Sequence, residues 1–329
     1  MWWMVGVGLV GLFLAAQAWR ARTCHEVEIS GHRRVVVITG CDSGIGYSVA
    51  MSARAWGWTV VATCLSPDGE GAAHLREAGV HIVIVDLTQT HTLAHLLHTI
   101  QRLKMNNQEV WCVVNNAGLL TYASCEWQTS EMVERQVAVN LTGVIQVTKA
   151  LLPTLRRNKG RVVMVSSPAG QVGTPTMSVY SATKWGVEGF TQAIRRELAS
   201  TGVSVVLVRP CNLPNRTGIL RNNAAQLREM IEGAGEETLR DYGEAMKEAE
   251  QVFHEAYGNV NQVQGLRDDR LLECFRSAIM SKRPLATYSA APLLVRVALN
   301  LLQLLPTAWV DFLCAIDFHY IVLSLAKNS

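Results

Sequence analysis

Apolar residues are grouped along the chain into short runs rich in valine and isoleucine, and longer amphipathic stretches separate these runs. The runs have the length and the β-branched composition of strands that are buried on both faces of a sheet. They span residues 33–40, 58–64, 81–86, 109–118, 160–167 and 203–210. The stretches between them are long enough for the helices of right-handed crossover connections. The pattern predicts one α/β domain with a doubly wound parallel sheet, in which ligands bind at the carboxyl ends of the strands.

The first residues of the chain depart from this alternation. Residues 2–19 carry no charge, and Arg20 and Arg22 follow them directly. A run of about 20 apolar residues can span a membrane. Because positive charge follows the run and does not precede it, we interpret it as an uncleaved anchor and not as a signal peptide, with the rest of the chain in the cytosol.

The C-terminal segment is also apolar. Between Ala291 and Leu325 the apolar sequence is interrupted by Arg296, Pro306 and two aspartates. These interruptions favour helices that lie on a bilayer or line an apolar substrate entrance over a second membrane span. Core helices are the alternative interpretation.

These patterns divide the chain into three parts. An N-terminal anchor and linker covers residues 1–30, the α/β domain covers residues 31–290, and the apolar C-terminal segment covers residues 291–329. Within the domain, a polar helical stretch at residues 221–257 follows the sixth predicted strand. An insertion that covers the substrate would lie at this place.

Composition narrows the classes of partner. Hydrophobic residues make up 49% of the chain and charged residues 17%, which suits contact with a membrane. The net charge of +3 includes no basic tract, so nucleic acid is not expected as a partner. The eight cysteines include no Cys-x-x-Cys pair, which argues against a zinc site and a redox dithiol.

A glycine-rich segment, TGCDSGIG at residues 39–46, lies between the first predicted strand and its helix. Glycines at such a turn let the backbone approach a pyrophosphate, whose charge the N–H groups of the helix N-terminus can bind. Asp86, at the end of the third strand, could accept a hydrogen bond from an adenine amino group or cap the next helix. The segment NNAG at residues 115–118 ends the fourth strand, where it would form the floor of the same cleft or a plain turn.

Candidate chemistry follows the fifth strand. Tyr180 and Lys184 are four residues apart at the start of a predicted helix, so their side chains share one face. A fixed ammonium would lower the pKa of the phenol and make the pair a general acid/base, although the spacing alone also suits a solvated surface pair. Ser167 ends the fifth strand and could hold a substrate oxygen, and Asn140 could bend its helix and hold a water. The order of these motifs along the strands favours one joint site.

Taken together, the segments TGCDSGIG, NNAG, VN at 139–140, VSSPAG and YSATK resemble the short-chain dehydrogenase/reductase family over about residues 33–290. The resemblance implies a Rossmann-type fold, with Tyr180 as general acid/base and Lys184 lowering its pKa and binding the nicotinamide ribose. It also implies that Ser167 orients the substrate oxygen and that Asn140 holds the water of a proton relay. The implied cofactor-binding residues are Gly40, Ser43, Gly44, Ile45, Gly46, Asp86, Asn116, Ala117, Gly118, Tyr180, Lys184 and Pro210. No metal site is implied.

Further features resemble the branch of membrane-associated retinol, hydroxysteroid and 3-hydroxybutyrate dehydrogenases. They are GCDSGIG, the pair Cys64-Leu65, the run Asp241-Tyr242-Gly243, the apolar C-terminal segment, and RPCNLPNRT at 209–217, in which Cys211 replaces the branch's glycine. The branch implies hydride transfer between a nicotinamide cofactor and a lipophilic alcohol or ketone, a steroid or a retinoid. The alternatives are a small hydroxy acid bound by Arg209 or Arg216, an inactive nucleotide-binding relative, and a lyase, epimerase or enoyl reductase on the same fold.

NAD is predicted in preference to NADP, because binding of a 2′-phosphate usually needs a cation in the glycine loop or after the second strand. Here the first position is Ser43 and the second is Leu65-Ser66-Pro67-Asp68. The expected partners are a lipophilic substrate and membrane lipid, and a homodimer is a further expectation left open. The expected location is the membrane of the endoplasmic reticulum with the catalytic domain in the cytosol, or alternatively a mitochondrial membrane.

Overall fold

The computed structural model describes residues 28–211, 217–257, 266 and 268–315. The predicted anchor at residues 2–19, Arg216 and the chain beyond residue 315 lie outside the described residues. In the described part of the chain, parallel strands form one seven-stranded sheet in the order β3-β2-β1-β4-β5-β6-β7. The strands are β1 (Arg34–Ile38), β2 (Thr59–Cys64), β3 (His81–Ile84), β4 (Glu109–Asn115), β5 (Arg161–Val165), β6 (Ser204–Arg209) and β7 (Thr287–Ser289).

The predicted α/β architecture is confirmed, with small differences at the strand ends. All six predicted runs form strands, and the strand order reverses between β1 and β4, as in a doubly wound sheet. The strands β3, β4 and β5 end two or three residues earlier than predicted, at Ile84, Asn115 and Val165. Asp86, Asn116 and Ser167 therefore lie in the loops just beyond the strands.

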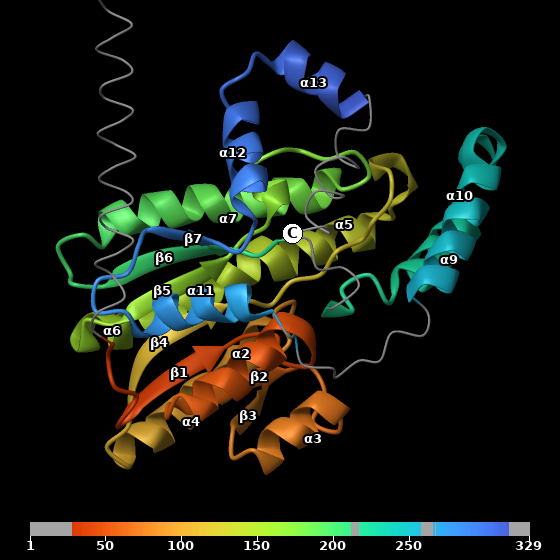
Figure 1. Ribbon diagram of the computed structural model, residues 1–329. Coiled ribbons are helices and arrows are strands. Elements are labelled where there is room, and N and C mark those ends of the chain that lie inside the picture. The colour runs from red at the N-terminus through yellow and green to blue at the C-terminus, as the bar shows by residue number, and fades with distance from the viewer. Residues whose placement is uncertain (1–27, 212–216, 258–265, 267, 316–329) are drawn as a thin grey trace, which may run out of the picture.

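Helices cover both faces of the sheet (Figure 1). One face is packed by α2 (Gly44–Ala55), α3 (Glu70–Glu77) and α11 (Asp269–Met280). The other face is packed by α4 (Leu93–Met105), α6 (Val144–Asn158) and α7 (Ser178–Glu197). The helix α5 (Ser130–Val137) contacts α7 and leads into α6 through a π-helical turn at Ala138–Gly143.

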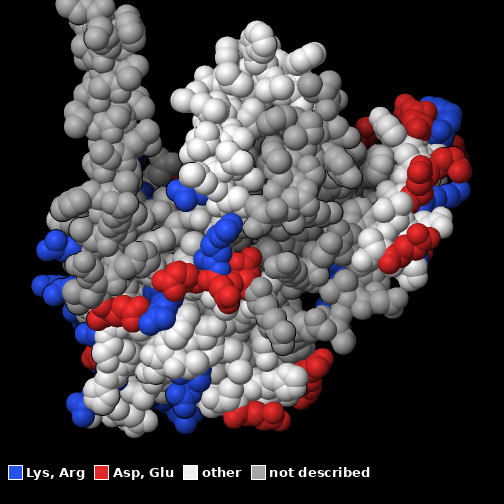
Figure 2. Space-filling view, viewed as in Figure 1, with Lys and Arg blue, Asp and Glu red and all other residues white. Residues whose placement is uncertain are grey.

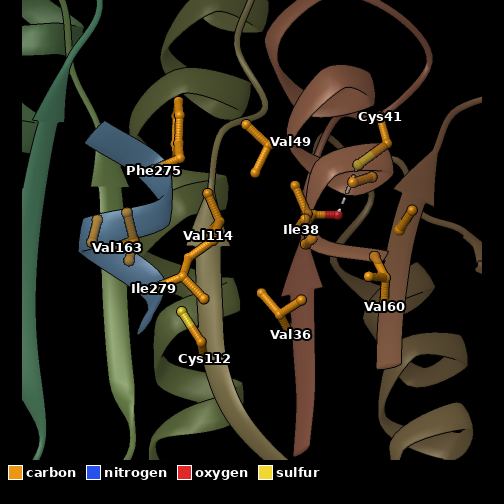
Figure 3. Packing of buried hydrophobic residues seen from close by; sticks show 14 of the residues in the cluster. Val36, Ile38, Cys41, Val49, Val60, Cys112, Val114, Val163, Phe275 and Ile279 are labelled. Carbon is orange, nitrogen blue, oxygen red and sulfur yellow. Dashed lines mark hydrogen bonds between the residues drawn. The ribbon is translucent and has the colours of Figure 1, made fainter. Parts of the chain in front are cut away.

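Strand β1 shows how the sequence alternation builds two cores. Val36 and Ile38 point towards α2 and α11, where they pack near Val49 and Phe275 (Figure 3). The neighbouring Val35 and Val37 pack in the cluster on the opposite face, and all four β1 side chains have no exposed surface. Full burial of such a side chain contributes roughly 1.5–3 kcal/mol. This is why the four residues from Val35 to Ile38 include no polar side chain.

A buried arginine fixes α11 against the sheet. Arg161, at the start of β5, is 2% exposed. Its guanidinium donates hydrogen bonds of 2.7 to 2.8 Å to the carbonyl oxygens of Ala278, Ile279 and Ser281. Carbonyls at the end of a helix lack partners within the helix. The arginine therefore satisfies the C-terminus of α11 and holds it near β7.

Residues 221–257 contain two helices, α9 (Asn223–Gly233) and α10 (Glu236–Tyr257), which contact each other. A small separate cluster joins them to the segment after β4; its buried members are Ala123, Met132, Leu227, Met230 and Met246. Phe253 of α10 packs on the Tyr122 ring with centroids 5.5 Å apart, and Tyr242 packs on Trp127 at 6.0 Å. The helix pair is thus attached beside the carboxyl ends of the strands through a few aromatic and methionine contacts.

The last two described helices, α12 (Leu293–Leu302) and α13 (Thr307–Ala315), project from the body of the protein (Figure 1). Their outer surface, with the short link between them, is mostly apolar and almost entirely white in Figure 2, and its exposed charged residues include Arg296 and Asp311. Its exposed large side chains are Leu293, Leu294, Val297, Leu301, Leu304, Leu305, Trp309 and Phe312. Throughout the described residues, every helix is too short or too polar to cross a bilayer.

Candidate active site

A cavity of about 430 Å³ opens at the carboxyl ends of the strands. It lies where the strand order reverses, which is the expected place for a ligand in an open α/β sheet. The predicted site residues that line it are Gly40, Ser43, Gly44, Ile45, Asp86, Asn116, Ala117, Gly118, Ser167, Tyr180, Lys184 and Pro210. Two of the predicted residues, Gly46 and Asn140, lie beside the cavity without lining it.

The glycine loop between β1 and α2 has the conformation that a dinucleotide requires. Gly40 and Gly44 have φ angles of +68° and +59°, which side-chain-bearing residues rarely adopt. A Cβ on Gly40 would lie 2.7 Å from the Ala117 Cα, and a Cβ on Gly46 would collide with the Gly40 carbonyl oxygen. Helix α2 begins at Gly44 without a side-chain cap, so N–H groups of its first turn are left for an anion.

The segment after β4 holds this loop in place. The Thr39 hydroxyl accepts hydrogen bonds from the backbone N–H groups of Asn116 and Ala117 at 3.1 and 3.0 Å. In return, the Asn116 side-chain amide donates to the carbonyl oxygens of Thr39 and Gly40 at 2.9 and 3.1 Å. Asn116 therefore does more than line the cleft, because its amide locks the backbone of the glycine loop. Asp86 also lines the cleft, and its Oδ1 accepts hydrogen bonds from the Thr88 N–H and hydroxyl.

Asn140 lies in the π-helical turn and has no exposed surface. Its Oδ1 accepts a hydrogen bond from the Leu119 N–H, and its Nδ2 donates to the Leu119 carbonyl, both at 2.8 Å. The same Nδ2 donates to the Thr183 hydroxyl at 3.2 Å. Both amide hydrogens are thus used within the protein. The side chain fixes the segment after β4 to helix α7, and the water-holding role implied by the resemblance stays a prediction.

Tyr180 and Lys184 lie on one face of α7, and both are buried. The Lys184 ammonium is 5.6 Å from the centroid of the Tyr180 ring and donates to the Val165 carbonyl at 3.2 Å. Burial raises the pKa of Tyr180 to about 12, and hydrogen bonding with Ser167 acts in the opposite direction. Burial also lowers the pKa of Lys184 to about 8.

These pKa directions bear on the predicted acid/base pair. The sequence spacing predicted that Lys184 lowers the pKa of the phenol, and that effect stays a prediction, while burial sets the net direction and raises the pKa of Tyr180. At neutral pH the phenol is therefore protonated and can donate a proton, while the lysine, with a pKa of about 8, keeps its charge. Ser167 hydrogen-bonds with Tyr180 in the same cavity, so its hydroxyl and the phenol can bind one substrate oxygen together.

Arg209 does not serve as the carboxylate ligand that the sequence suggested. Its Nε and Nη2 donate to the two Glu188 carboxylate oxygens at 2.7 and 2.6 Å, and the pair is largely buried. Among the described residues that line the cavity, the cations are Lys184 and Arg135. The ion pair instead fixes the end of β6 against α7, next to Pro210.

One wall of the cavity is apolar. The C-terminal segment, for which the sequence favoured helices on a bilayer or at an apolar substrate entrance, contributes Val295, Leu299, Leu302 and Cys314 to this wall. Its other members, Val172, Met177 and Ile219, were not predicted from the sequence. Helix α12 is tied to the loop after Ser167, because Gln303 donates to the Gln171 carbonyl at 3.1 Å. The i, i+4, i+7 spacing of Val295, Leu299 and Leu302 marks the buried face of an amphipathic helix and could have indicated this wall.

Similarity to known proteins agrees with this geometry. A sequence model of the family "short chain dehydrogenase" matches residues 34–228. Retinol dehydrogenase 7 of Mus musculus is 32% identical over 88% of this chain and 89% of its own length. The 17-beta-hydroxysteroid dehydrogenase type 6 of Homo sapiens is 33% identical over the same shares, 88% and 89%. Mitochondrial D-beta-hydroxybutyrate dehydrogenase of Rattus norvegicus is 33% identical over 69% and 68%.

Among solved structures, an alcohol dehydrogenase of the archaeon Thermococcus sibiricus complexed with 5-hydroxy-NADP is similar at 26% identity. The match has a TM-score of 0.50 and covers 55% of this chain and 77% of the other. The family model spans more than half of the chain, and the relatives align over most of it. The chain therefore belongs to the short-chain dehydrogenase family, and it is an oxidoreductase that acts on CH–OH groups.

Proposed function

We propose that this enzyme transfers hydride between a nicotinamide dinucleotide, NAD(H) by preference, and the hydroxyl-bearing carbon of a steroid or retinoid. The observation that carries the proposal is that Ser167 and Tyr180 share one cavity with an apolar wall. Two relatives that align over most of the chain are named as a retinol dehydrogenase and a hydroxysteroid dehydrogenase.

The cofactor cleft fits a dinucleotide. The positive φ angles of Gly40 and Gly44, the lack of space for a Cβ at Gly46 and the uncapped start of α2 together form a cradle for a pyrophosphate. Asp86 lines the same cleft, where it could bind an adenine amino group. When bound, the nicotinamide ring donates or accepts the hydride.

The protein moves the proton. In ketone reduction, Ser167 holds the carbonyl oxygen and the phenol of Tyr180 donates its proton to that oxygen. In alcohol oxidation, the Tyr180 phenolate accepts the hydroxyl proton, so the oxidation rate rises with pH towards the raised pKa of Tyr180. Lys184 supplies a positive charge beside the ring while it stays protonated, and Asn140 positions helix α7 relative to the segment after β4.

The apolar wall sets the substrate class. A steroid or retinoid gains about 0.8 kcal/mol for each methylene that it buries, so an apolar wall can supply most of its affinity. A small hydroxy acid needs a cation for its carboxylate. Arg209 is already held by Glu188, which leaves Arg135 and Lys184 among the described lining residues. Apolar side chains outnumber these two cations in the lining, so a lipophilic alcohol suits the cavity better.

The apolar surface of α12 and α13 suits a membrane location. Val295, Leu299 and Leu302 line the cavity, while Leu294 and Leu301 of the same helix are exposed. A lipid-facing helix that also lines the cavity would give a lipophilic substrate a path from the bilayer. We propose the membrane of the endoplasmic reticulum, with the catalytic domain on the cytosolic side.

The experiment is a screen for NADH release by membranes that contain the full chain, tested against steroids, retinol and 3-hydroxybutyrate. Membranes with the Tyr180→Phe variant are the matched control. Activity on a steroid or retinol that is lost in the variant supports the proposal. Activity on 3-hydroxybutyrate alone would assign the site to a small hydroxy acid, and dinucleotide binding without turnover of any alcohol would favour an inactive relative.

A further inference from the structure

The end of β2 lacks the residue that commonly selects NAD. In dinucleotide-binding folds, an acid about 20 residues beyond the glycine loop often binds the ribose 2′-hydroxyl. Here β2 ends at Cys64, and Leu65 and Ser66 follow. The first acid in this loop is Asp68, which is exposed and does not line the cavity.

A carboxylate reaches the same place from the glycine loop. The Asp42 Oδ1 accepts a hydrogen bond of 2.8 Å from the Leu65 N–H, which bridges the glycine loop to the end of β2. Asp42, Thr63, Cys64 and Leu65 all line the cavity. The Asp42 charge contributes to the raised pKa of Cys64, which also indicates that the two side chains are close.

The backbone holds this carboxylate in place. The Cys41 N–H donates to the Thr63 carbonyl at 2.8 Å, and the Gly40 N–H donates to the Thr63 hydroxyl at 3.3 Å. On the other side, a Cβ on Gly71 of α3 would collide with the Asp42 carbonyl oxygen. The loop is thus packed between β2 and α3, and the position of Asp42 is fixed before any ligand binds.

We propose that Asp42 replaces the acid that is missing at the end of β2. It binds the adenosine ribose and makes the enzyme prefer NAD(H) to NADP(H). This inference rests on the proposed dinucleotide function and names the residue that carries the cofactor preference. One carboxylate oxygen holds Leu65, and the other can accept a hydrogen bond from a ribose hydroxyl. A 2′-phosphate would instead bring a second negative charge beside Asp42, which is unfavourable.

A cation near the loop after β2 could have the opposite effect on cofactor preference. Arg76 of α3 donates from Nη2 to the Pro67 carbonyl at 3.0 Å, in the loop after β2. It does not line the cavity. If the Arg76 side chain turned towards a bound ligand, it would favour NADP(H) instead, and the experiment includes this outcome.

The experiment titrates the purified full chain with NADH and with NADPH and follows the quenching of protein fluorescence. Asp42→Asn keeps an oxygen for the Leu65 N–H and removes the charge. We expect the ratio of NADH affinity to NADPH affinity to fall at least about tenfold. Asp68→Asn makes the same change on the exposed loop and should alter the ratio less than about twofold. Asp42→Ser, with thermal unfolding as a folding check, provides a second variant.

Each result decides between defined alternatives. Three results would each overturn the inference. In Asp42→Asn, the ratio of NADH affinity to NADPH affinity could stay unchanged, or the affinity for both dinucleotides could fall equally. The wild type could also prefer NADPH, with a preference that Arg76→Gln abolishes. Alcohol turnover with NAD by the wild type is measured in parallel. If turnover is present while the ratio ignores Asp42, only this inference fails. If neither dinucleotide binds, the proposed function fails with it.

Discussion

The catalytic face of α7 is polar but buried, whereas the outer surface of α12 and α13 is mostly apolar but exposed. Tyr180 and Lys184 are polar and are 8% and 4% exposed. Leu304 and Phe312 are apolar and are 79% and 61% exposed. Burial of a polar group costs free energy unless it finds partners, and a large exposed apolar patch commonly marks a binding surface. Both regions therefore give up stability, and we propose that the first does so for proton chemistry and the second for contact with lipid.

The buried polar side chains of the site differ in how far hydrogen bonds compensate for their burial. Asn140 makes three hydrogen bonds with protein atoms, so its burial stabilises the fold. Lys184 has a lowered pKa, which means that burial disfavours its charged form. We infer that the Asn140 amide supports the structure of the site and that the Lys184 ammonium takes part in its chemistry. The variants below separate these two roles and then test the apolar surface.

The largest effect is expected for Tyr180→Phe. The variant keeps the ring that packs in the apolar cluster beside the cavity and removes the proton donor. A positioned acid/base contributes about 10²- to 10⁴-fold, so kcat should fall by about that factor while the affinity for NADH is kept. Steady-state kinetics and fluorescence titration measure the two quantities. Tyr242→Phe on the surface of α10 is the matched control, and near-normal kcat in Tyr180→Phe would contradict the assignment.

The second effect concerns stability. Asn140→Ala removes the partner of both the N–H and the carbonyl of Leu119. An unpaired buried group costs about 1–3 kcal/mol, so the free energy of unfolding should fall by about 2–4 kcal/mol in urea titrations. Asn158→Ala, which removes one hydrogen bond to the Val110 carbonyl, is the graded control and should cost about 1 kcal/mol. Equal losses would show that the support role of Asn140 is overstated.

Lys184→Met should act in the opposite direction. In the unfolded chain the lysine pKa is near 10.5 and in the fold it is about 8, so the unfolded chain binds the proton more tightly between these values. The wild type is therefore penalised at pH 7 and recovers stability as the pH rises from about 8 to about 10.5. The variant should be more stable at pH 7 by up to about 3 kcal/mol, and should lose turnover.

Unfolding measured from pH 7 to 10.5 checks this sign. Cys64 and Cys112, whose pKa values burial raises to about 12, give the opposite slope above pH 9, but they are present in both proteins. The difference between wild type and variant isolates Lys184. A constant difference across this pH range would mean that the buried lysine is not the cause.

The sequence predicted most of the sheet because strands buried on both faces leave a clear record of continuous apolar residues. It missed β7, whose three residues Thr287–Ser289 include polar side chains and are too few to form a pattern. The polar site residues were also predictable, since a parallel sheet brings the carboxyl ends of its strands together. Twelve of the fourteen predicted site residues line one cavity, all except Gly46 and Asn140.

The features that the sequence did not predict depend on contacts between residues that are far apart in the sequence. The pairing of Arg209 with Glu188 links two elements, and it decides that the arginine is not available for a substrate carboxylate. The raised pKa of Tyr180 comes from burial under neighbouring elements, which helical spacing cannot show. The sequence marks an apolar face of α12, but the contact of Val295 and Leu299 with this particular cavity depends on where α12 docks. Such features follow from tertiary packing, and only the structure reveals them.

The smallest expected effect tests the exposed side of the comparison. If α12 and α13 rest on lipid, phospholipid vesicles added to the full chain should slow amide hydrogen exchange in residues 293–315. Transfer of a leucine side chain from water to an apolar phase is worth about 1.5 kcal/mol or more, so Leu304→Asp should reduce this protection about tenfold. Met105→Asp, at an α4 residue that is 80% exposed against 79% for Leu304, should leave it unchanged. If the wild type shows no protection, or if the two variants have equal effects, then this apolar surface does not bind lipid. The comparison would then hold only for the buried catalytic face of α7.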